Sequence, residues 1–122
     1  MSASSAGRRS VLIVEDNEAL RHTILDSAAS LGCEAWQASD GLEALWIGKR
    51  HRPTLVLLDL TMPRLDGFET IRHIRKFDPS IEIVVVTGDA SEPTRRRVEE
   101  LGLGLLIKPF KLHELDSLFA PR

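Results

Sequence analysis

Five polar side chains follow directly on short apolar runs of the chain, and their types could do chemistry together. Two acidic residues follow the first run, an aspartate the second, a threonine the third and a lysine the last: Glu15, Asp16, Asp59, Thr87 and Lys108. Short apolar runs are typical of buried strands in a parallel sheet, and the carboxyl ends of parallel strands meet at one edge. We therefore expect three carboxylates, one hydroxyl and one ammonium in a single crevice.

The charge balance of this crevice predicts a metal ion. Two carboxylates about 4 Å apart repel by roughly 1 kcal/mol in water and by about 4 kcal/mol at an effective dielectric constant of 20. Three carboxylates make three such pairs, which one lysine cannot neutralise. A hard divalent cation can, and oxygen ligands from few side chains favour Mg²⁺, which keeps several waters and shares its other positions with a phosphate. The residues therefore indicate phosphoryl transfer to a carboxylate nucleophile.

Each of these residues also has an ordinary structural explanation. An acidic residue after a strand often caps the next helix, a threonine there is common in turns, and a lysine is a solvated charge. Taken one at a time, the structural explanation is the better one. It accounts poorly for polar and mutually complementary residues at the ends of all four runs.

The elements that must position these residues alternate along the chain. Apolar runs too short for helices predict five strands, two of them weaker than the rest, at residues 11–14, 35–38, 55–58, 81–86 and 105–107. Helical spacing or capping signals lie between and after them, with a repeat over 20–31, capping boxes at Asp40 and Asp66, a possible cap at Ser91 and a repeat over 112–119. This order predicts an α/β fold with a parallel sheet covered on both faces.

Length and composition limit what the chain can be. Its 122 residues suit one domain, and 43% hydrophobic with 28% charged residues is typical of a globular protein. The single cysteine, Cys33, excludes an intrachain disulfide and indicates a reducing compartment, so we expect a cytoplasmic protein. No apolar run approaches the roughly 20 residues of a membrane span, and a net charge of −2 offers no basic footprint for nucleic acid. We expect a flexible leader over residues 1–9, one domain over 10–122, and no direct contact with membrane or nucleic acid.

Five segments together resemble the receiver domain of response regulators, the CheY-like domain of bacterial two-component signalling. They read Val-Leu-Ile-Val-Glu-Asp-Asn at 11–17, Ala-Ser-Asp-Gly-Leu-Glu-Ala-Leu at 38–45, Leu-Leu-Asp-Leu-Thr-Met-Pro-Arg-Leu-Asp-Gly at 57–67, Val-Val-Thr-Gly at 85–88 and Lys-Pro-Phe at 108–110. The resemblance extends over essentially all of residues 11–119. It implies a doubly wound, five-stranded sheet of the flavodoxin-like (βα)5 type.

The resemblance also implies a phosphoacceptor and its metal ligands. Asp59 would take a phosphoryl group from a histidine kinase or a phosphotransfer protein. Asp16, the Asp59 carboxylate and the backbone carbonyl of Thr61 would bind Mg²⁺ directly, and Glu15 would act through a metal-bound water.

The remaining site residues follow from the same resemblance. Lys108 would pair with Asp59 and later with a phosphoryl oxygen, and its bond to Pro109 resembles one that is cis in the family. Thr87 would swing toward the phosphate. Gly88 would leave room for it, and Gly67 would permit a tight turn after Met62 and Pro63.

Two positions bear on how such a site would signal. The family usually has Tyr or Phe where this chain has Leu105, so we expect the signal to travel instead through backbone and helix shifts around 92–101. Asp89 lies two residues after Thr87, at a position that tunes phosphoryl lifetime in the family. Its carboxylate either orients a water for hydrolysis or is simply solvated.

Three further features concern contacts with partners. Arg95 and Arg96 belong to a basic run that forms either a solvated helix face or a docking patch for a protein partner. Trp46 is expected to cover the sheet beside Leu42 and Leu45. Trp36 is expected to be partly exposed and to act in association.

These observations together predict a phosphoacceptor receiver domain, acting as a single-domain response regulator. Phosphorylation of Asp59 with Mg²⁺ would switch a surface that binds a downstream protein. Apart from self-catalysed phosphotransfer and autodephosphorylation, no enzyme activity is expected. The alternative is an adaptor that uses the receiver fold without phosphorylation, for which Leu105 is the best support. A small phosphatase would need a second acid two residues after Asp59, where the chain has Thr61.

Overall fold

A computed structural model describes residues 9–62 and 66–120 of the chain. Strands and helices alternate from the first element to the last: β1 (Ser10–Val14), α1 (Glu18–Ser30), β2 (Glu34–Ala38), α2 (Gly41–His51), β3 (Leu55–Asp59), α3 (Gly67–Phe77), β4 (Glu82–Thr87), α4 (Glu92–Glu100), β5 (Gly104–Ile107) and α5 (Leu112–Phe119). The expected leader, apart from Arg9, and Pro63 of the expected turn lie outside the described residues. Arg9 is buried and its guanidinium binds the Glu82 carboxylate at 2.8 Å, so the packed part of the chain includes it.

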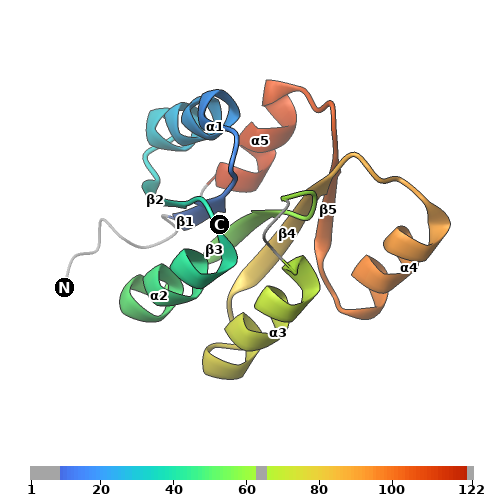
Figure 1. Cartoon of the computed structure of the whole chain (residues 1–122). Coiled ribbons are helices and arrows are strands. Elements are labelled where there is room, and N and C mark those ends of the chain that lie inside the picture. The colour runs from blue at the N-terminus through green and yellow to red at the C-terminus, as the bar shows by residue number, and fades with distance from the viewer. Residues whose placement is uncertain (1–8, 63–65, 121–122) are drawn as a thin grey trace.

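All five strands pair in parallel in one sheet of order β2-β1-β3-β4-β5. Helices α1 and α5 cover one face, and α2, α3 and α4 cover the other (Figure 1). The predicted doubly wound, flavodoxin-like α/β fold is confirmed. Among the described residues, no helix is both long and apolar enough to cross a membrane.

The two faces of the sheet divide its side chains into two cores. Leu12 and Val14 of β1 pack on the side of α2 and α3, whereas Val11 and Ile13 pack on the side of α1 and α5. Strand β3 is buried along its whole length, because helices cover both of its faces. At roughly 1.5 to 3 kcal/mol for each fully buried aliphatic side chain, this burial fixes the central strands firmly. Their carboxyl ends are therefore rigid supports for the residues that follow.

The helix caps agree in part with the sequence. Asp40 and Asp66 accept hydrogen bonds from the backbone N–H groups of Glu43 and Glu69, at 2.8 and 3.1 Å, as the capping boxes predict. Ser91 stands at the N-cap position of α4, but its side chain makes no capping hydrogen bond. The carboxylate of Asp89 instead accepts from the Ser91 N–H and the Thr94 hydroxyl, at 2.9 and 2.6 Å.

One expectation about packing was wrong. Trp46 does not cover the sheet: it is 63% exposed, because the phase of α2 turns Ala44 and Gly48 toward the core. The tight turn expected before Gly67 includes residues 63–65, which lie outside the described residues. Gly67 itself opens α3, where a Cβ atom would meet the Leu60 side chain. Glycine at this position lets the start of α3 lie close to the end of β3. Trp36 is half-buried, as expected, and stacks on His51 at 4.5 Å between ring centroids.

Candidate functional site

The acidic residues after β1 and β3 meet because the two strands are neighbours in register. Val14 pairs with Leu58, so the next residues, Glu15 and Asp59, leave the sheet side by side. One carboxylate oxygen each from Glu15, Asp16 and Asp59 lies within 4.8 Å of the others. Glu15 and Asp59 are buried, whereas Asp16 is exposed. The predicted three-carboxylate cluster is therefore present at the carboxyl edge of the sheet.

Lys108 reaches this cluster from β5, two strands away from β3. Its Nζ lies 2.7 Å from Oδ2 of Asp59 and 3.6 Å from Oε1 of Glu15. A backbone hydrogen bond fixes Lys108 at the end of the sheet, because its N–H donates to the Thr87 carbonyl at 2.9 Å. The Lys108–Pro109 bond is cis, as the resemblance implies. One ammonium thus serves two buried carboxylates.

The second oxygen of Asp59 is held by Thr61. Both the backbone N–H and the hydroxyl of Thr61 donate to Oδ1 of Asp59, at 2.8 and 2.6 Å. The sequence pointed to the Thr61 carbonyl and gave no role to its hydroxyl. Because Lys108 binds Oδ2, both oxygens of Asp59 have fixed partners in this state, which orients the carboxylate.

The surroundings of Glu15 make its carboxyl group hard to ionise. Burial and the neighbouring Asp59 carboxylate raise the pKa of Glu15 to about 7, although the Asn17 N–H bound to Oε2 at 3.1 Å partly offsets this. Burial disfavours the ionised form, and a like charge nearby disfavours it further. The cluster therefore holds more negative charge than Lys108 can compensate.

Asp59 and Lys108 stabilise each other's charged forms. Burial by itself raises the pKa of Asp59, but hydrogen bonds from Lys108 and Thr61 outweigh it, and the net pKa is lowered. Burial likewise lowers the pKa of Lys108, but Asp59 and Glu15 outweigh it, and the net pKa is raised. Asp59 is accordingly an ionised carboxylate at neutral pH, as a nucleophile requires.

Thr87 and Asp89 lie at the end of β4, on the far side of β3 from Glu15. Thr87 is buried, and its Oγ1 accepts the Asp89 N–H at 3.0 Å. The exposed Asp89 carboxylate is bound by Ser91 and Thr94 at the start of α4, and the Thr94 hydroxyl is the largest cause of its lowered pKa. In this state Asp89 thus connects the strand end to α4. No Cβ-sized obstacle lies around Gly88, in keeping with the space expected there.

The expected signalling residues lie on α4 and β5. Leu105 is half-buried and packs against the core on the side of α2 and α3. The two arginines of the basic run are exposed: Arg95 donates to the Ala90 carbonyl at 2.9 Å, and Arg96 pairs with Glu92 at 3.0 Å. Both bonds are local to the start of α4, so neither arginine contacts the acidic cluster.

The donor set fits a hard divalent cation. Three carboxylates converge within 4.8 Å, all donors are oxygens, and the exposed Asp16 leaves the cluster open to solvent on one side. A dication would lower the repulsion that raises the pKa of Glu15. Few protein ligands with open positions for water are typical of Mg²⁺.

A family model described as the response regulator receiver domain matches residues 11–120. Response regulator MprA of Mycobacterium sp. strain KMS is 39% identical over 108 residues, which cover 86% of this chain and 46% of MprA. The chain therefore spans about half the length of such relatives. Sporulation initiation phosphotransferase F of Bacillus subtilis strain 168 is 33% identical over 106 residues, and 86% of each chain is covered.

A solved structure of similar fold contains a metal ion. The receiver domain of sensor histidine kinase PA1611 from Pseudomonas aeruginosa PAO1 superposes with a TM-score of 0.79 and 30% identity. The match covers 92% of this chain and 94% of that domain. A magnesium ion is coordinated in the active-site cleft of that protein.

Proposed function

This chain belongs to the response regulator receiver domain family of two-component signalling, and we propose that it accepts a phosphoryl group on Asp59 and thereby switches a protein-binding surface. The observation that carries the proposal is the pair of fixed contacts on Asp59. Lys108 Nζ and the Thr61 donors hold its two oxygens, and two further carboxylates adjoin it. Such an arrangement presents an oriented anionic nucleophile beside a cation binding site.

The reaction is an exchange of one bond for another at phosphorus. An oxygen of Asp59 attacks the phosphorus of a phosphohistidine on a histidine kinase or a phosphotransfer protein. The new O–P bond forms as the N–P bond breaks, and the imidazole leaves with its electron pair. The Lys108 ammonium then moves from the Asp59 oxygen to a phosphoryl oxygen, because after the transfer the negative charge lies on the phosphoryl group.

We propose that Mg²⁺ has three direct protein ligands, which are the carboxylates of Asp16 and Asp59 and the backbone carbonyl of Thr61. Glu15 would act through a metal-bound water. Bound there, Mg²⁺ would neutralise the carboxylates and the phosphoryl oxygens that join them. Thr87 is buried beside the cluster and would turn its hydroxyl toward the phosphate, releasing the Asp89 N–H that it now accepts.

The output is a change in the surface around α4. Release of Thr87 would loosen the link from Asp89 to the first turn of α4, and Leu105 offers no aromatic side chain to report the change. We propose that a downstream protein reads this surface, with Arg95 and Arg96 as contacts. We further propose that the protein works in the cytoplasm, without direct contact with membrane or nucleic acid, and turns over no separate substrate.

Incubation with acetyl phosphate and Mg²⁺, followed by intact mass measurement, tests the proposal. We expect one phosphoryl increment in the native chain, its loss in Asp59→Asn, and its retention in Asp116→Asn, which changes an exposed aspartate of α5. Chelation of Mg²⁺ should also abolish the increment. An increment in none of the chains would favour the phosphorylation-independent adaptor, and one that persists in Asp59→Asn would assign the phosphoryl group elsewhere.

A further inference from the structure

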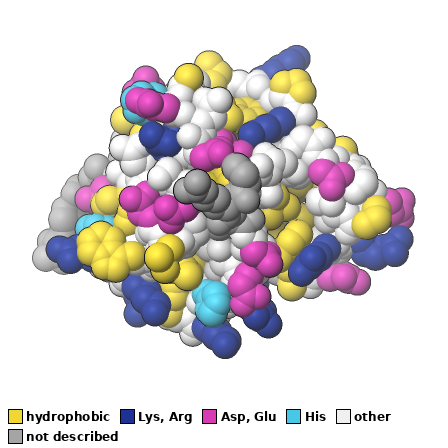
Figure 2. Space-filling model, viewed as in Figure 1, with side chains coloured by type: hydrophobic (Ala, Val, Ile, Leu, Met, Phe, Trp, Pro, Cys, Tyr) yellow, Lys and Arg dark blue, Asp and Glu magenta, His cyan; other side chains and the backbone are white. Residues whose placement is uncertain are grey.

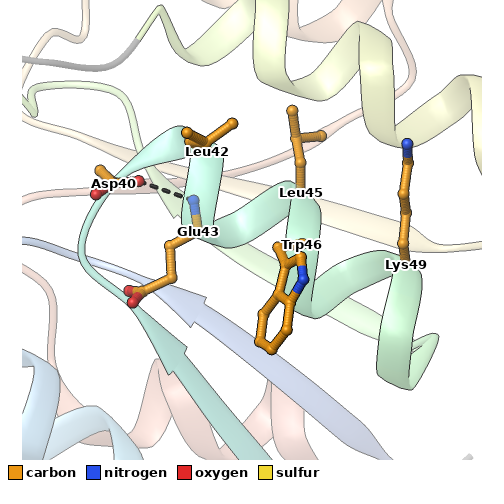
Figure 3. A pocket seen from close by; sticks show the side chains of 6 residues that line it. All are labelled: Asp40, Leu42, Glu43, Leu45, Trp46 and Lys49. Atoms are coloured by element: carbon orange, nitrogen blue, oxygen red, sulfur yellow. Dashed lines mark hydrogen bonds between the residues drawn. The ribbon is translucent and has the colours of Figure 1, made fainter.

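An apolar groove lies on the outer side of α2. Leu42 is 80% exposed and Trp46 is 63% exposed, which is unusual for side chains of this size. Asp40, Leu42, Glu43, Leu45, Trp46 and Lys49 line the groove. In Figure 3, Leu42, Leu45 and Lys49 point toward one edge of the exposed surface of α2 and Trp46 toward the opposite edge, so the two leucines and the indole border the groove.

The spacing of these residues is that of a helix-packing seam. Leu42, Leu45, Trp46 and Lys49, here called the α2 stripe, occupy positions i, i+3, i+4 and i+7 of one helix face. This is the spacing with which a helix packs against another helix. Ala44 and Gly48 supply the fully buried contacts of α2. Leu45 also packs against the core, and the Lys49 ammonium lies 5.9 Å from the centre of the Phe77 ring of α3, so Leu42 and Trp46 are the most exposed part of the stripe.

Charges of opposite sign stand at the two ends of the stripe. Asp40 and Glu43 lie at its amino-terminal end, and Lys49 and Arg50 lie at its carboxyl-terminal end. Figure 2 shows hydrophobic side chains gathered over α2, with acidic side chains to one side of them and basic ones to the other. A partner helix that complements the stripe must therefore be apolar in the middle, basic at one end and acidic at the other.

We propose that a second copy of this chain covers the α2 stripe, with the two α2 helices antiparallel about a two-fold axis. If the axis passes between Leu45 and Trp46, Leu42 faces the partner's Lys49, and Leu45 faces the partner's Trp46. Leu42 of the first copy then packs on the aliphatic part of the partner's Lys49, whose ammonium lies near Asp40 and Glu43 of the first copy. Each such contact occurs twice, as the symmetry of a two-fold interface requires.

The stripe selects against the parallel arrangement. Parallel helices would bring Glu43 against the partner's Glu43 and Lys49 against the partner's Lys49, and like charges repel. The antiparallel arrangement joins opposite charges and opposes the two helix dipoles. A second copy thus supplies all three required features, namely an apolar centre with a basic and an acidic end.

The proposed interface is small, so we expect the two copies to associate weakly. An interface built on one helix from each copy belongs to the small, transient class that buries less than about 1,200 Å² in total. Association should therefore depend on concentration and weaken with salt, since its charged ends are exposed. It should be independent of Asp59, which does not lie on α2.

Sedimentation equilibrium of the whole chain tests the proposal. We expect the mean mass to rise from 13.6 kDa toward twice that value as the protein is concentrated. Leu42→Asp should weaken association about tenfold or more. Leu112→Asp is the matched control, because Leu112 is also an exposed leucine, 55% accessible, but lies on α5. Asp59→Asn should associate as the native chain does, which separates this proposal from the phosphoacceptor role.

Cysteine cross-linking tests the direction of the helices. In a chain whose buried Cys33 is replaced by alanine, Leu42→Cys should form a disulfide with Lys49→Cys when the two variants are mixed, and little with itself. Self-linking of Leu42→Cys as the main product would overturn the antiparallel arrangement. A mass that stays at 13.6 kDa up to about 1 mM protein, or equal association of Leu42→Asp and the native chain, would overturn the proposal itself.

Discussion

The carboxyl edge of the sheet and helix α4 are fixed by different means. Glu15 and Asp59 follow strands whose neighbours on both sides are other strands, and both carboxylates are buried. Of the residues of α4, Val98 alone is buried, and its N-cap serine makes no capping bond. The first region cannot relax around its charges, whereas the second is held by few contacts and can shift at small cost.

This difference explains how a charge bound at the rigid edge of the sheet can change the conformation of α4. A rigid acidic edge keeps three carboxylates together even though their repulsion raises the pKa of Glu15 to about 7. Asp89 connects the two regions, since its N–H binds Thr87 at the edge and its carboxylate binds Ser91 and Thr94 at α4. A new charge at the edge should therefore change the conformation of α4 more than that of the strands.

Lys108→Ala should produce the largest effect, on the rigid edge. Removing one positioned electrostatic group commonly costs about 10² to 10³ in rate, so phosphorylation by acetyl phosphate should slow by that order, as followed by intact mass. Mg²⁺ should bind more tightly, because a competing cation is gone. Lys76→Ala, at an exposed lysine of α3, should change neither. Weaker Mg²⁺ binding by Lys108→Ala would contradict the charge balance described for the cluster.

Stability in Mg²⁺-free buffer should fall between about pH 4.5 and pH 7. The pKa of Glu15 rises from 4.5 to about 7 on folding, so the native state binds the extra proton in this window and loses that advantage as pH increases through 7. At 1.36 kcal/mol for each pKa unit, the free energy of unfolding should decrease by about 3 kcal/mol over this range. Urea unfolding at a series of pH values measures it. Glu15→Gln should flatten the profile. A native profile that rises with pH over this window would contradict the raised pKa.

Truncation of one buried side chain in α3 and one in α4 should separate global from local stability. Ile74→Ala in α3 should lower the free energy of unfolding by about 3 kcal/mol, whereas Val98→Ala should cost about 1 to 2 kcal/mol. We expect Val98→Ala to speed amide hydrogen exchange in α4 while the central strands stay protected. Equal acceleration in both regions would show that α4 is not a separate, weaker unit.

Asp89→Ala should have a smaller effect, limited to the start of α4. The substitution removes the acceptor for the Ser91 N–H and the Thr94 hydroxyl, and a lost cap costs about 1 kcal/mol. Amide exchange should quicken in the first turn of α4, and Asp89→Asn, which keeps an acceptor oxygen, should restore much of the protection. The phosphoryl lifetime in the same variants tests the other role of Asp89, because an unchanged lifetime excludes water positioning by its carboxylate.

The acidic cluster was predictable because strand direction alone brings it together. Parallel strands end at one edge, so Glu15 and Asp59 had to be neighbours once β1 and β3 were adjacent. The capping aspartates at 40 and 66 were equally local, because the bonds they make span three residues. Most of the fold and of the site could therefore be predicted from rules that depend on sequence distance or on strand direction.

Features that depend on helix phase or on side-chain competition could not be read from the sequence. Trp46 and Ala44 both suit a helix, and only the packed sheet decides which of them faces inward. At the start of α4, the Asp89 carboxylate rather than the N-cap Ser91 side chain supplies the acceptor, and it binds the Ser91 N–H and the Thr94 hydroxyl. The close approach of α3 to the end of β3 at Gly67 is a tertiary contact, which no local pattern records.

Hydrogen exchange with and without acetyl phosphate, in Mg²⁺ buffer, tests the central account most directly. For a sample shown by mass to be phosphorylated, we predict a changed exchange rate in the peptide covering α4 and the Asp89 turn, with the β3 strand unchanged. Asp59→Asn under the same conditions should show no change in either. Full phosphorylation with α4 exchange unaltered, or with the change confined to other elements, would contradict the transfer of the signal from the acidic edge to α4.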